Sequence, residues 1–207
     1  MLRKVIPLIF MLVCFSAIAE DKKSQQQLEE FLASTNTLSA HFQQKLVDEY
    51  GMLLQQSTGT LNMQRPGKFR WDYILPYPQS IISNGKKLWM YDSELEQANV
   101  RPYDQMLSSS PVNLLDKNQK LDEEFIVYSL PFEKDQHWIK LLPKNKESDF
   151  KEMLIGMHNG KIKTMHFLDN FNQRTEIDFE KMTTNVNFTA KQFEFSAPQG
   201  TDIIGDF

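Results

Sequence analysis

Residues 65–91 read RPGKFRWDYILPYPQSIISNGKKLWMY, and no other stretch is as informative about the fold. In residues 68–75, aromatic and aliphatic side chains alternate with charged ones, which is the period-two pattern of a half-buried strand. Pro76 and Pro78 end that strand, because proline has no N–H group to donate to a sheet. Asn84-Gly85, between two apolar runs, predicts a β-hairpin with a type I′ turn.

Strand patterns continue on both sides of this stretch. Residues 40–46 alternate, and residues 52–63 form a long strand-like run in which Gly59 indicates a bulge or a bend. Asn159-Gly160 predicts a second hairpin. Further strands are expected at 96–103, 125–130, 137–142, 151–157, 161–168 and 174–180. The chain is therefore predicted to be mainly antiparallel β, with about nine to eleven short strands.

Two regions have helical character and give the chain an α+β class. Leu28, Phe31 and Leu32 have i, i+3, i+4 spacing and follow a capping-box pattern that starts at Ser24, so we expect a helix over about 22–34. Residues 104–124 contain a stop followed by a helix start, which predicts one or two short helices. No repeat or linker divides the sequence, which indicates one domain.

The N-terminus has the features of a cleaved signal peptide. Two basic residues precede an apolar run over 5–18, and Ala17-Ile18-Ala19 fits the small-x-small cleavage pattern. We expect residues 1–19 to be removed and residues 20–207 to form the single mature domain. Cys14, the only cysteine, would leave with the signal, so the mature chain would have no disulfide and no lipid anchor.

The charge balance argues against two classes of partner. The formal net charge is −4, and it becomes more negative once the basic residues of the signal are removed. Nucleic-acid affinity comes mainly from Lys and Arg at phosphates, and an anionic membrane surface attracts the same residues. Neither fits an acidic chain.

Motifs for catalysis, cofactors and metals are missing from the sequence. It contains no Gly-x-Ser-x-Gly elbow, no phosphate-binding glycine loop and no dinucleotide fingerprint. None of the four histidines has metal-ligand spacing to another. Carboxylate pairs such as Asp92/Glu94 and Glu176/Asp178 have the spacing that puts both groups on one strand face, which is usually the solvated one. We therefore expect a non-enzyme without cofactor or metal.

The aromatic strand leaves two interpretations open. Phe69, Trp71 and Tyr73 on one face of a strand are either ordinary core or an apolar surface that binds a ligand. Methionines favour the second interpretation, because methionine fills adaptable apolar surfaces and all but two of the ten follow the expected cleavage site. Our candidate lining of a ligand cavity is Phe69, Trp71, Tyr73, Met52, Leu54 and Met90.

Arg65 also has two interpretations. It precedes Pro66, so its backbone is expected to be extended, at the edge of the aromatic strand. It is either a solvated arginine or a guanidinium whose five donors reach carbonyl groups on a neighbouring element and latch a flap. Our candidate for that element is the helical insert near residues 111–118.

Several motifs along the chain resemble the LolA family of periplasmic outer-membrane lipoprotein carriers. They are the Arg-Pro-x-x-Phe-x-Trp pattern at 65–71, Ser-Asn-Gly-Lys-Lys-Leu-Trp-Met-Tyr at 83–91, Glu-Gln-Ala at 96–98, an insert near Pro111, and Phe-x-Phe-x-x-Pro-x-Gly at 193–200. The central motifs are specific, the last one is weak by itself, and the resemblance covers essentially the whole mature chain.

This resemblance implies a fold and a task. The fold would be an unclosed antiparallel half-barrel of about eleven strands with a lid of short helices over an apolar cavity. The task would be to bind the acyl chains of lipoproteins released by an inner-membrane ABC transporter (LolCDE) and to deliver them across the periplasm to the outer-membrane receptor LolB, as a monomer. Arg65 falls on the family's lid latch, and Phe69 falls on a cavity position. The alternative is a LolA-like periplasmic protein that binds or senses lipids or lipoproteins.

Overall fold

The computed structural model describes residues 16–103, 114–115 and 121–205, with side chains from Ser24 onward. Within these residues, twelve strands form one sheet, accompanied by the helices α1 and α3 and the 3-10 turn η2, and the mainly antiparallel prediction is confirmed. The elements are α1 Ser16–Ser34, β1 Thr37–Val47, β2 Leu53–Gln64, β3 Lys68–Leu75, β4 Gln79–Asn84, β5 Lys87–Asp92, β6 Gln97–Pro102, α3 Leu121–Glu124, β7 Phe125–Glu133, β8 Gln136–Pro143, β9 Phe150–His158, β10 Lys161–Asp169, β11 Arg174–Thr184, η2 Ala190–Phe193 and β12 Asp202–Gly205.

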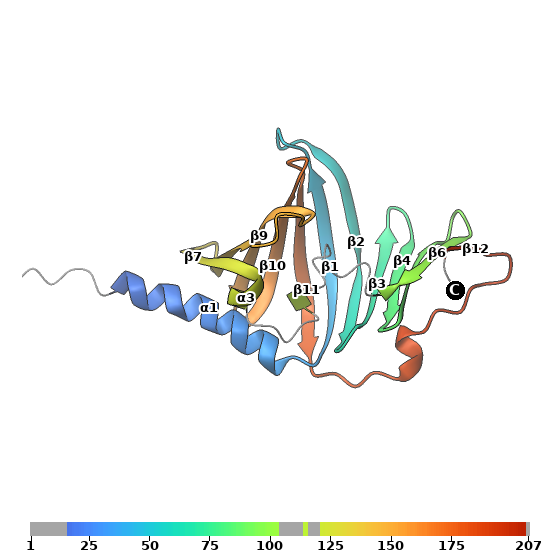
Figure 1. Cartoon of the computed structure of the whole chain (residues 1–207), viewed down its shortest axis with the longest axis horizontal. Helices are drawn as coiled ribbons and strands as arrows, with labels where there is room; N and C mark the ends of the chain where they lie inside the picture. The colour runs from blue at the N-terminus through green and yellow to red at the C-terminus, as the bar shows by residue number, and fades with distance from the viewer. Residues whose placement is uncertain (1–15, 104–113, 116–120, 206–207) are drawn as a thin grey trace, which may run out of the picture.

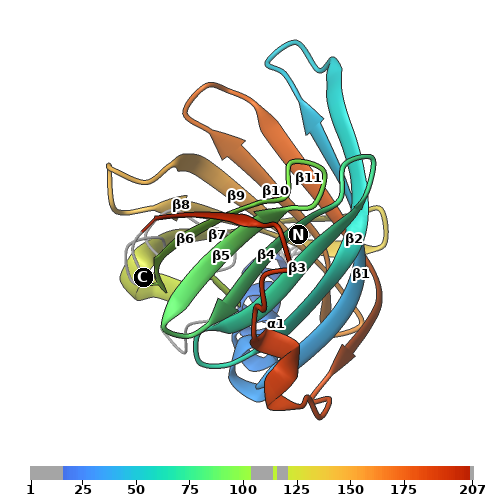
Figure 2. The same ribbon diagram turned by 90° about the vertical axis from the view of Figure 1, so that its right-hand side faces the viewer.

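The sheet is open and strongly curved. Its strand order is β12-β6-β5-β4-β3-β2-β1-β11-β10-β9-β8-β7, so β12 and β7 are the two edges. β1 pairs with both β2 and β11, which joins the first half of the chain to the second half at the middle of the sheet. The curved sheet forms a half-barrel whose inner side faces α1 (Figures 1 and 2).

The N-terminal helix is longer than predicted. It begins at Ser16 and not near residue 22, so Ser24 lies inside the helix, where it is buried, and does not cap it. The added segment, Ser-Ala-Ile-Ala-Glu-Asp at 16–21, includes two alanines and a glutamate, which have high helix propensity, and extension of an existing helix adds one hydrogen bond per residue. The predicted apolar stripe is correct, since Leu28, Phe31 and Leu32 are all buried.

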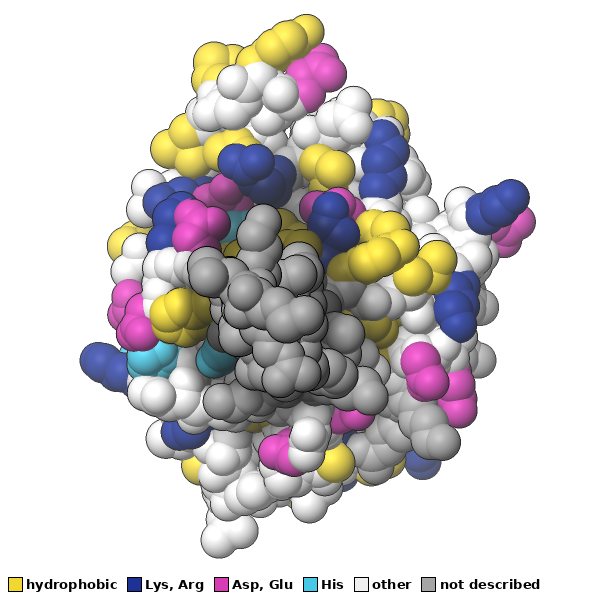
Figure 3. Space-filling view, turned by 90° about the vertical axis from the view of Figure 1, so that its left-hand side faces the viewer, with side chains coloured by type: hydrophobic (Ala, Val, Ile, Leu, Met, Phe, Trp, Pro, Cys, Tyr) yellow, Lys and Arg dark blue, Asp and Glu magenta, His cyan; other side chains and the backbone are white. Residues whose placement is uncertain are grey.

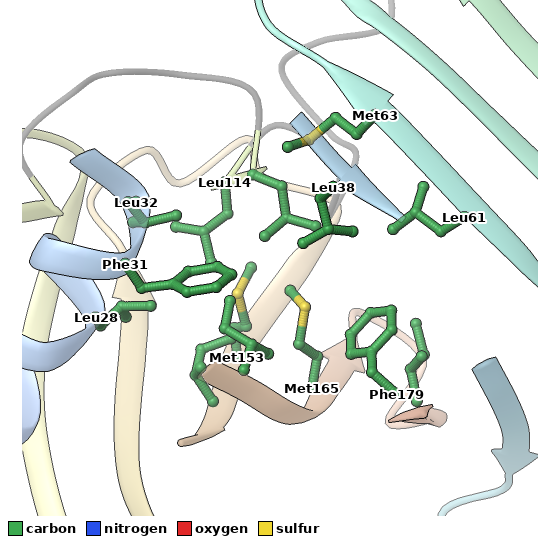
Figure 4. Close-up of a cluster of buried hydrophobic side chains, with 14 of the residues drawn as sticks. Leu28, Phe31, Leu32, Leu38, Leu61, Met63, Leu114, Met153, Met165 and Phe179 are labelled. Carbon is green, nitrogen blue, oxygen red and sulfur yellow. The ribbon is translucent and has the colours of Figure 1, made fainter. Parts of the chain in front are cut away.

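The main core lies between the inner face of the sheet and α1. Figure 4 shows leucine and phenylalanine side chains of α1 beside apolar side chains of β1, β2, β9, β10 and β11. Leu114, Leu115 and Leu121 join the same core from the region where short helices were predicted. The rest of the insert, 104–113 and 116–120, lies outside the described residues. The inner face is thus filled with the chain's own apolar side chains.

The two Asn-Gly hairpins differ in geometry. Asn159 and Gly160 both have positive φ, as a type I′ turn requires. The prediction of the same turn at Asn84-Gly85 is wrong, since only Gly85 has positive φ. Asn84 instead uses its carboxamide oxygen to accept hydrogen bonds from the backbone N–H groups of two following residues, Lys86 and Lys87. A Cβ on Gly67 would lie 2.9 Å from the Gly85 Cα, so Gly67 is needed where these two turns touch, while the φ of 86° at Gly85 favours glycine there.

A second, smaller core lies on the outer face of β3 to β6. Phe193 of η2 is buried there, and Phe195 packs against Trp89 and Tyr91 with ring centroids 6.1 and 5.3 Å away. We call Trp89, Tyr91, Phe193 and Phe195 the outer aromatic cluster. The C-terminal segment that carries the two phenylalanines runs along this face and ends in β12 (Figure 2), a strand that the sequence did not predict.

Candidate functional site

The predicted aromatic strand faces the inner side of the sheet. Phe69 and Trp71 are each only 6% exposed, and Tyr73 packs at the border of the same core. Phe42 of β1 completes the group, with ring centroids 4.8 Å from Trp71 and 5.3 Å from Tyr73. We call Phe42, Trp71 and Tyr73 the inner aromatic cluster. Three of the six cavity candidates therefore meet in one place.

Gly59 allows these rings to approach the strand beside them. A Cβ at this position would lie 2.0 Å from the Asp72 carbonyl oxygen and 2.6 Å from the Phe42 ring. The pairing of β2 with β3 also shifts here, since Gly59 is opposite Tyr73 whereas Thr58 is opposite Leu75. The predicted irregularity at Gly59 is confirmed, and both the backbone of β3 and the Phe42 ring occupy the place that a side chain would take.

Two polar groups lie within this otherwise apolar cluster. The Tyr73 hydroxyl donates a hydrogen bond to Gln44 Oε1 at 3.1 Å. Burial raises the pKa of Tyr73, and the hydrogen bond with Gln44 opposes that effect in part, so the hydroxyl stays neutral at physiological pH. The Trp71 N–H lies close enough to this hydroxyl to favour its ionised form slightly, yet it makes no hydrogen bond.

Arg65 joins three elements at the end of β2. Its Nε donates to the carbonyl oxygen of Leu115 at 2.6 Å, and its Nη1 donates to the carbonyl oxygen of Leu32. Leu32 lies in the last turn of α1, where carbonyl groups have no partner within the helix and the helix dipole favours a cation. The interpretation as a solvated arginine is wrong, because the guanidinium binds carbonyl groups on two neighbouring elements.

Asn185 supports the same helix end. Its side-chain amide donates to the Ser34 carbonyl at 3.0 Å, and its Oδ1 accepts the Asn36 N–H at 3.0 Å. The Arg65 backbone N–H also donates to the Asn36 carbonyl at 2.9 Å. The end of α1 is therefore attached to the sheet by a small polar network, while the rest of the helix contacts the sheet through apolar side chains.

The three remaining cavity candidates are divided between the core and the surface. Met90 points inward from β5 and packs against the main core. Met52 and Leu54 are 62% and 45% exposed at the tip of the β1–β2 hairpin and do not join the core. Leu46 and Val47 pair with Gln55 and Leu53, which leaves Leu54 as the extra residue of a bulge. Figure 3 shows apolar side chains at this protruding end.

Some inner-face residues were missing from the predicted site. Phe42 and Gln44 contact the predicted aromatic residues, and their alternation along β1 was the signal that could have identified them. Leu115 lies in the insert near residues 111–118 that was our candidate partner of Arg65, so the element was predicted although the residue was not. The Leu32 carbonyl on α1 was not predicted, because every residue has a backbone carbonyl group.

The chemistry of this site is that of an apolar surface with a few hydrogen-bond donors. In the parts of the chain that the structure describes, no group of three or more His, Cys, Asp or Glu side chains is arranged to hold a metal ion. A search of the same residues finds no helix long and apolar enough to cross a membrane. We call residues 114–115 the Leu115 segment. If α1 and the Leu115 segment move away from the sheet, this arrangement exposes an apolar face.

Comparison with known proteins assigns a family to this architecture. Residues 33–196 match the family model of the outer membrane lipoprotein carrier protein LolA. An outer-membrane lipoprotein carrier protein of Methylococcus capsulatus is 39% identical over 200 residues, covering 96% of each chain. Another from Dechloromonas aromatica is 37% identical over 180 residues, covering 87% of this chain and 86% of the relative.

Solved structures agree on the fold. A conserved protein of Thermus thermophilus superposes with a TM-score of 0.56 at 12% identity, covering 88% of this chain and 97% of that one. The LolA superfamily protein NE2245 of Nitrosomonas europaea superposes with a TM-score of 0.50 at 9% identity, covering 84% and 97%. The open half-barrel, the inner aromatic strand and the match over residues 33–196 together establish that this chain belongs to the LolA family of outer-membrane lipoprotein carriers.

Proposed function

We propose that this protein carries lipoproteins through the periplasm by holding their acyl chains against the inner face of its half-barrel. The observation that carries the proposal is the inner aromatic strand, an apolar face that is covered, among the residues the structure describes, by α1 and by Leu114, Leu115 and Leu121. Family membership supplies the class of cargo. Phe69, Trp71, Tyr73 and Met90 would contact the chains, and Met52 and Leu54 would contact them at the rim.

The size of the hydrophobic effect explains why a carrier is needed. Burial of one methylene group contributes about 0.8 kcal/mol. Three acyl chains of about sixteen carbons would therefore cost roughly 35–40 kcal/mol to expose to water. A lipoprotein with such chains would not cross an aqueous compartment without a protein that shields them.

The closed inner face provides a physical basis for release. In the empty protein, α1 and the Leu115 segment fill the space that cargo would take, so binding must first displace them. Displacement breaks the Arg65 hydrogen bonds and exposes apolar surface, and this cost offsets part of the gain from burying acyl chains. The net affinity stays modest, and cargo passes on to a receptor that binds it more tightly. Arg65 thus acts as a lid latch.

The partners and the compartment follow from the same proposal. The donor would be the inner-membrane transporter LolCDE, and the acceptor would be the outer-membrane receptor LolB. The protein would act in the periplasm as a monomer after removal of residues 1–19. Depletion of the protein in cells should then make lipoproteins accumulate in the inner membrane, and native mass spectrometry of the periplasmic protein should detect a lipoprotein adduct.

A charge on the inner face tests the proposed binding surface. Phe69→Glu would place a carboxylate against acyl chains, and we expect release of lipoproteins from spheroplasts to fall more than about tenfold, since an unpaired buried charge is highly unfavourable. Because Phe69 is buried in the closed protein, the variant should also lose stability, so folding must be verified by circular dichroism.

A matched variant separates surface charge from cargo binding. Phe171→Glu changes a phenylalanine that is 82% exposed in the turn between β10 and β11, and it should release lipoproteins as the wild type does. Normal release by folded Phe69→Glu would contradict the proposed binding surface.

A further inference from the structure

Trp71 carries an unused hydrogen-bond donor in the middle of the inner face. The residue is 94% buried, since only 6% of its surface is exposed, and its Nε1 makes no hydrogen bond to any described group. Most buried polar groups in proteins have a partner, and an exception calls for an explanation. An N–H group can only donate, so what it lacks is an acceptor.

In the closed protein that donor has no hydrogen-bonded acceptor among its described neighbours. Phe42 packs against the indole ring with centroids 4.8 Å apart. The nearby Tyr73 hydroxyl is engaged with Gln44 Oε1, and the indole N–H makes no hydrogen bond to it. On β2, the partner of Trp71 is Leu61, which is fully buried. The N–H therefore lies unbonded at a place where an incoming carbonyl oxygen can supply the acceptor.

We propose that the Trp71 indole N–H donates a hydrogen bond to an acyl carbonyl oxygen of the cargo. This inference rests on the proposed function, because it assumes that acyl chains reach the inner face. Ester and amide carbonyls are the polar atoms nearest to an acyl chain, and as acceptors they match a site that offers only a donor. This bond would fix how far the bonded chain slides along the sheet and would distinguish an acyl chain from a plain alkyl chain.

A direct test observes the indole N–H itself. The protein contains three tryptophans, and Trp71→Phe identifies the Trp71 indole signal in ¹⁵N-correlated NMR spectra by its loss. The two probes are methyl palmitate and methyl hexadecyl ether, which match in chain length and differ in the carbonyl group. We expect the ester to shift the Trp71 N–H resonance downfield and the ether not to do so. Trp138 is the internal control, since its Nε1 already donates to the Glu133 carbonyl at 3.1 Å.

An affinity measurement gives the second readout. Displacement of a fluorescent fatty-chain probe should show that the wild type binds the ester about fivefold more tightly than the ether, as expected for one neutral hydrogen bond. Trp71→Phe should abolish this ratio, while any loss of packing should weaken both probes equally. Comparison of ratios keeps the test valid even if the variant is less stable.

The outcomes separate this inference from the proposed function. If the wild type binds both probes equally, or if Trp71→Phe retains the preference for the ester, the hydrogen bond is refuted and the carrier function stands. If the wild type binds neither probe while lipoproteins are still released in its presence, the site of cargo binding is elsewhere and the inference falls with it.

Discussion

The inner and outer aromatic clusters consist of the same kinds of residue but are covered differently. The inner cluster, with Trp71 and Tyr73 of β3, belongs to a core that α1 closes, and the end of α1 is held by hydrogen bonds from Arg65. The outer cluster is covered by the C-terminal segment, which supplies two of its four rings and continues into β12, a strand paired with β6.

This difference shows that aromatic content alone does not define a binding surface. What matters is whether the cover can leave. On the outer face the cover is part of the aromatic cluster and is attached through backbone hydrogen bonds of the sheet. On the inner face the cover is attached through an arginine side chain and a small polar network, which can open without loss of any strand. The inner face is therefore the one that can exchange its own cover for cargo.

The strongest test of this comparison removes a fully buried ring of the outer cluster. Phe193 is only 1% exposed, and Phe193→Ala should lower the free energy of unfolding by about 3–5 kcal/mol through lost burial and a cavity. Urea denaturation measures this loss. Phe171→Ala, at a phenylalanine that is 82% exposed, should change stability by no more than about 0.5 kcal/mol. Lipoprotein uptake per folded Phe193→Ala molecule should equal that of the wild type, and a specific loss of uptake would show that the outer face also binds cargo.

A smaller effect is expected from the latch. Hydrogen bonds from a charged donor contribute about 1.5–3 kcal/mol, so Arg65→Leu should favour the open inner face. We expect this variant to accept lipoprotein but to pass it to purified receptor at least about tenfold more slowly. Arg65→Lys should be partly defective, because an ammonium group lacks the planar fork that spans two carbonyl groups.

An arginine on the outer face of the same strand region is the control for the latch. Arg70 pairs with Asp72 at 2.7 Å and is partly exposed, so Arg70→Leu should hand over cargo at the wild-type rate. If Arg65→Leu also delivers cargo at that rate, Arg65 has a structural role only.

The smallest expected effect concerns His166, on the outer face of the other half of the sheet. Its ring centroid lies 5.3 Å from that of Trp138. Burial lowers the pKa of His166, and two carboxylates and two cations nearby modify this effect: Glu176, Arg174, Asp178 and Lys134. Because the unfolded state then takes up a proton first, His166 removes stability as pH falls below about 6.5. His166→Gln should therefore lose less stability than the wild type between about pH 7 and 5 in urea titrations. Equal losses in both proteins would refute this role of His166.

Much of the fold could be predicted from local pattern. Alternation of apolar and polar residues identified strands in both halves of the chain. The spacing of Leu28, Phe31 and Leu32 identified the buried face of α1. The predicted start of α1 was wrong, because the helix continues towards the N-terminus past Ser24, where the capping pattern had placed its beginning. β12 was missed, because a strand of four residues that pairs in parallel with a distant partner has no local signal.

The sequence by itself determined the family and the one-sided aromatic strand, and it singled out Arg65 with the insert near residues 111–118 as its candidate partner, because side-chain alternation and short motifs are local properties. Only the tertiary structure decided which side of the sheet the aromatic face takes and which atoms Arg65 binds, namely the carbonyl oxygen of Leu115 in that insert and that of Leu32 on α1. It also placed Met52 and Leu54 outside the core, because the end of the β1–β2 hairpin extends past the core and residues 53–56 are exposed on both faces of the strand. Contacts between distant segments depend on register and curvature, which the order of residues along one strand does not contain.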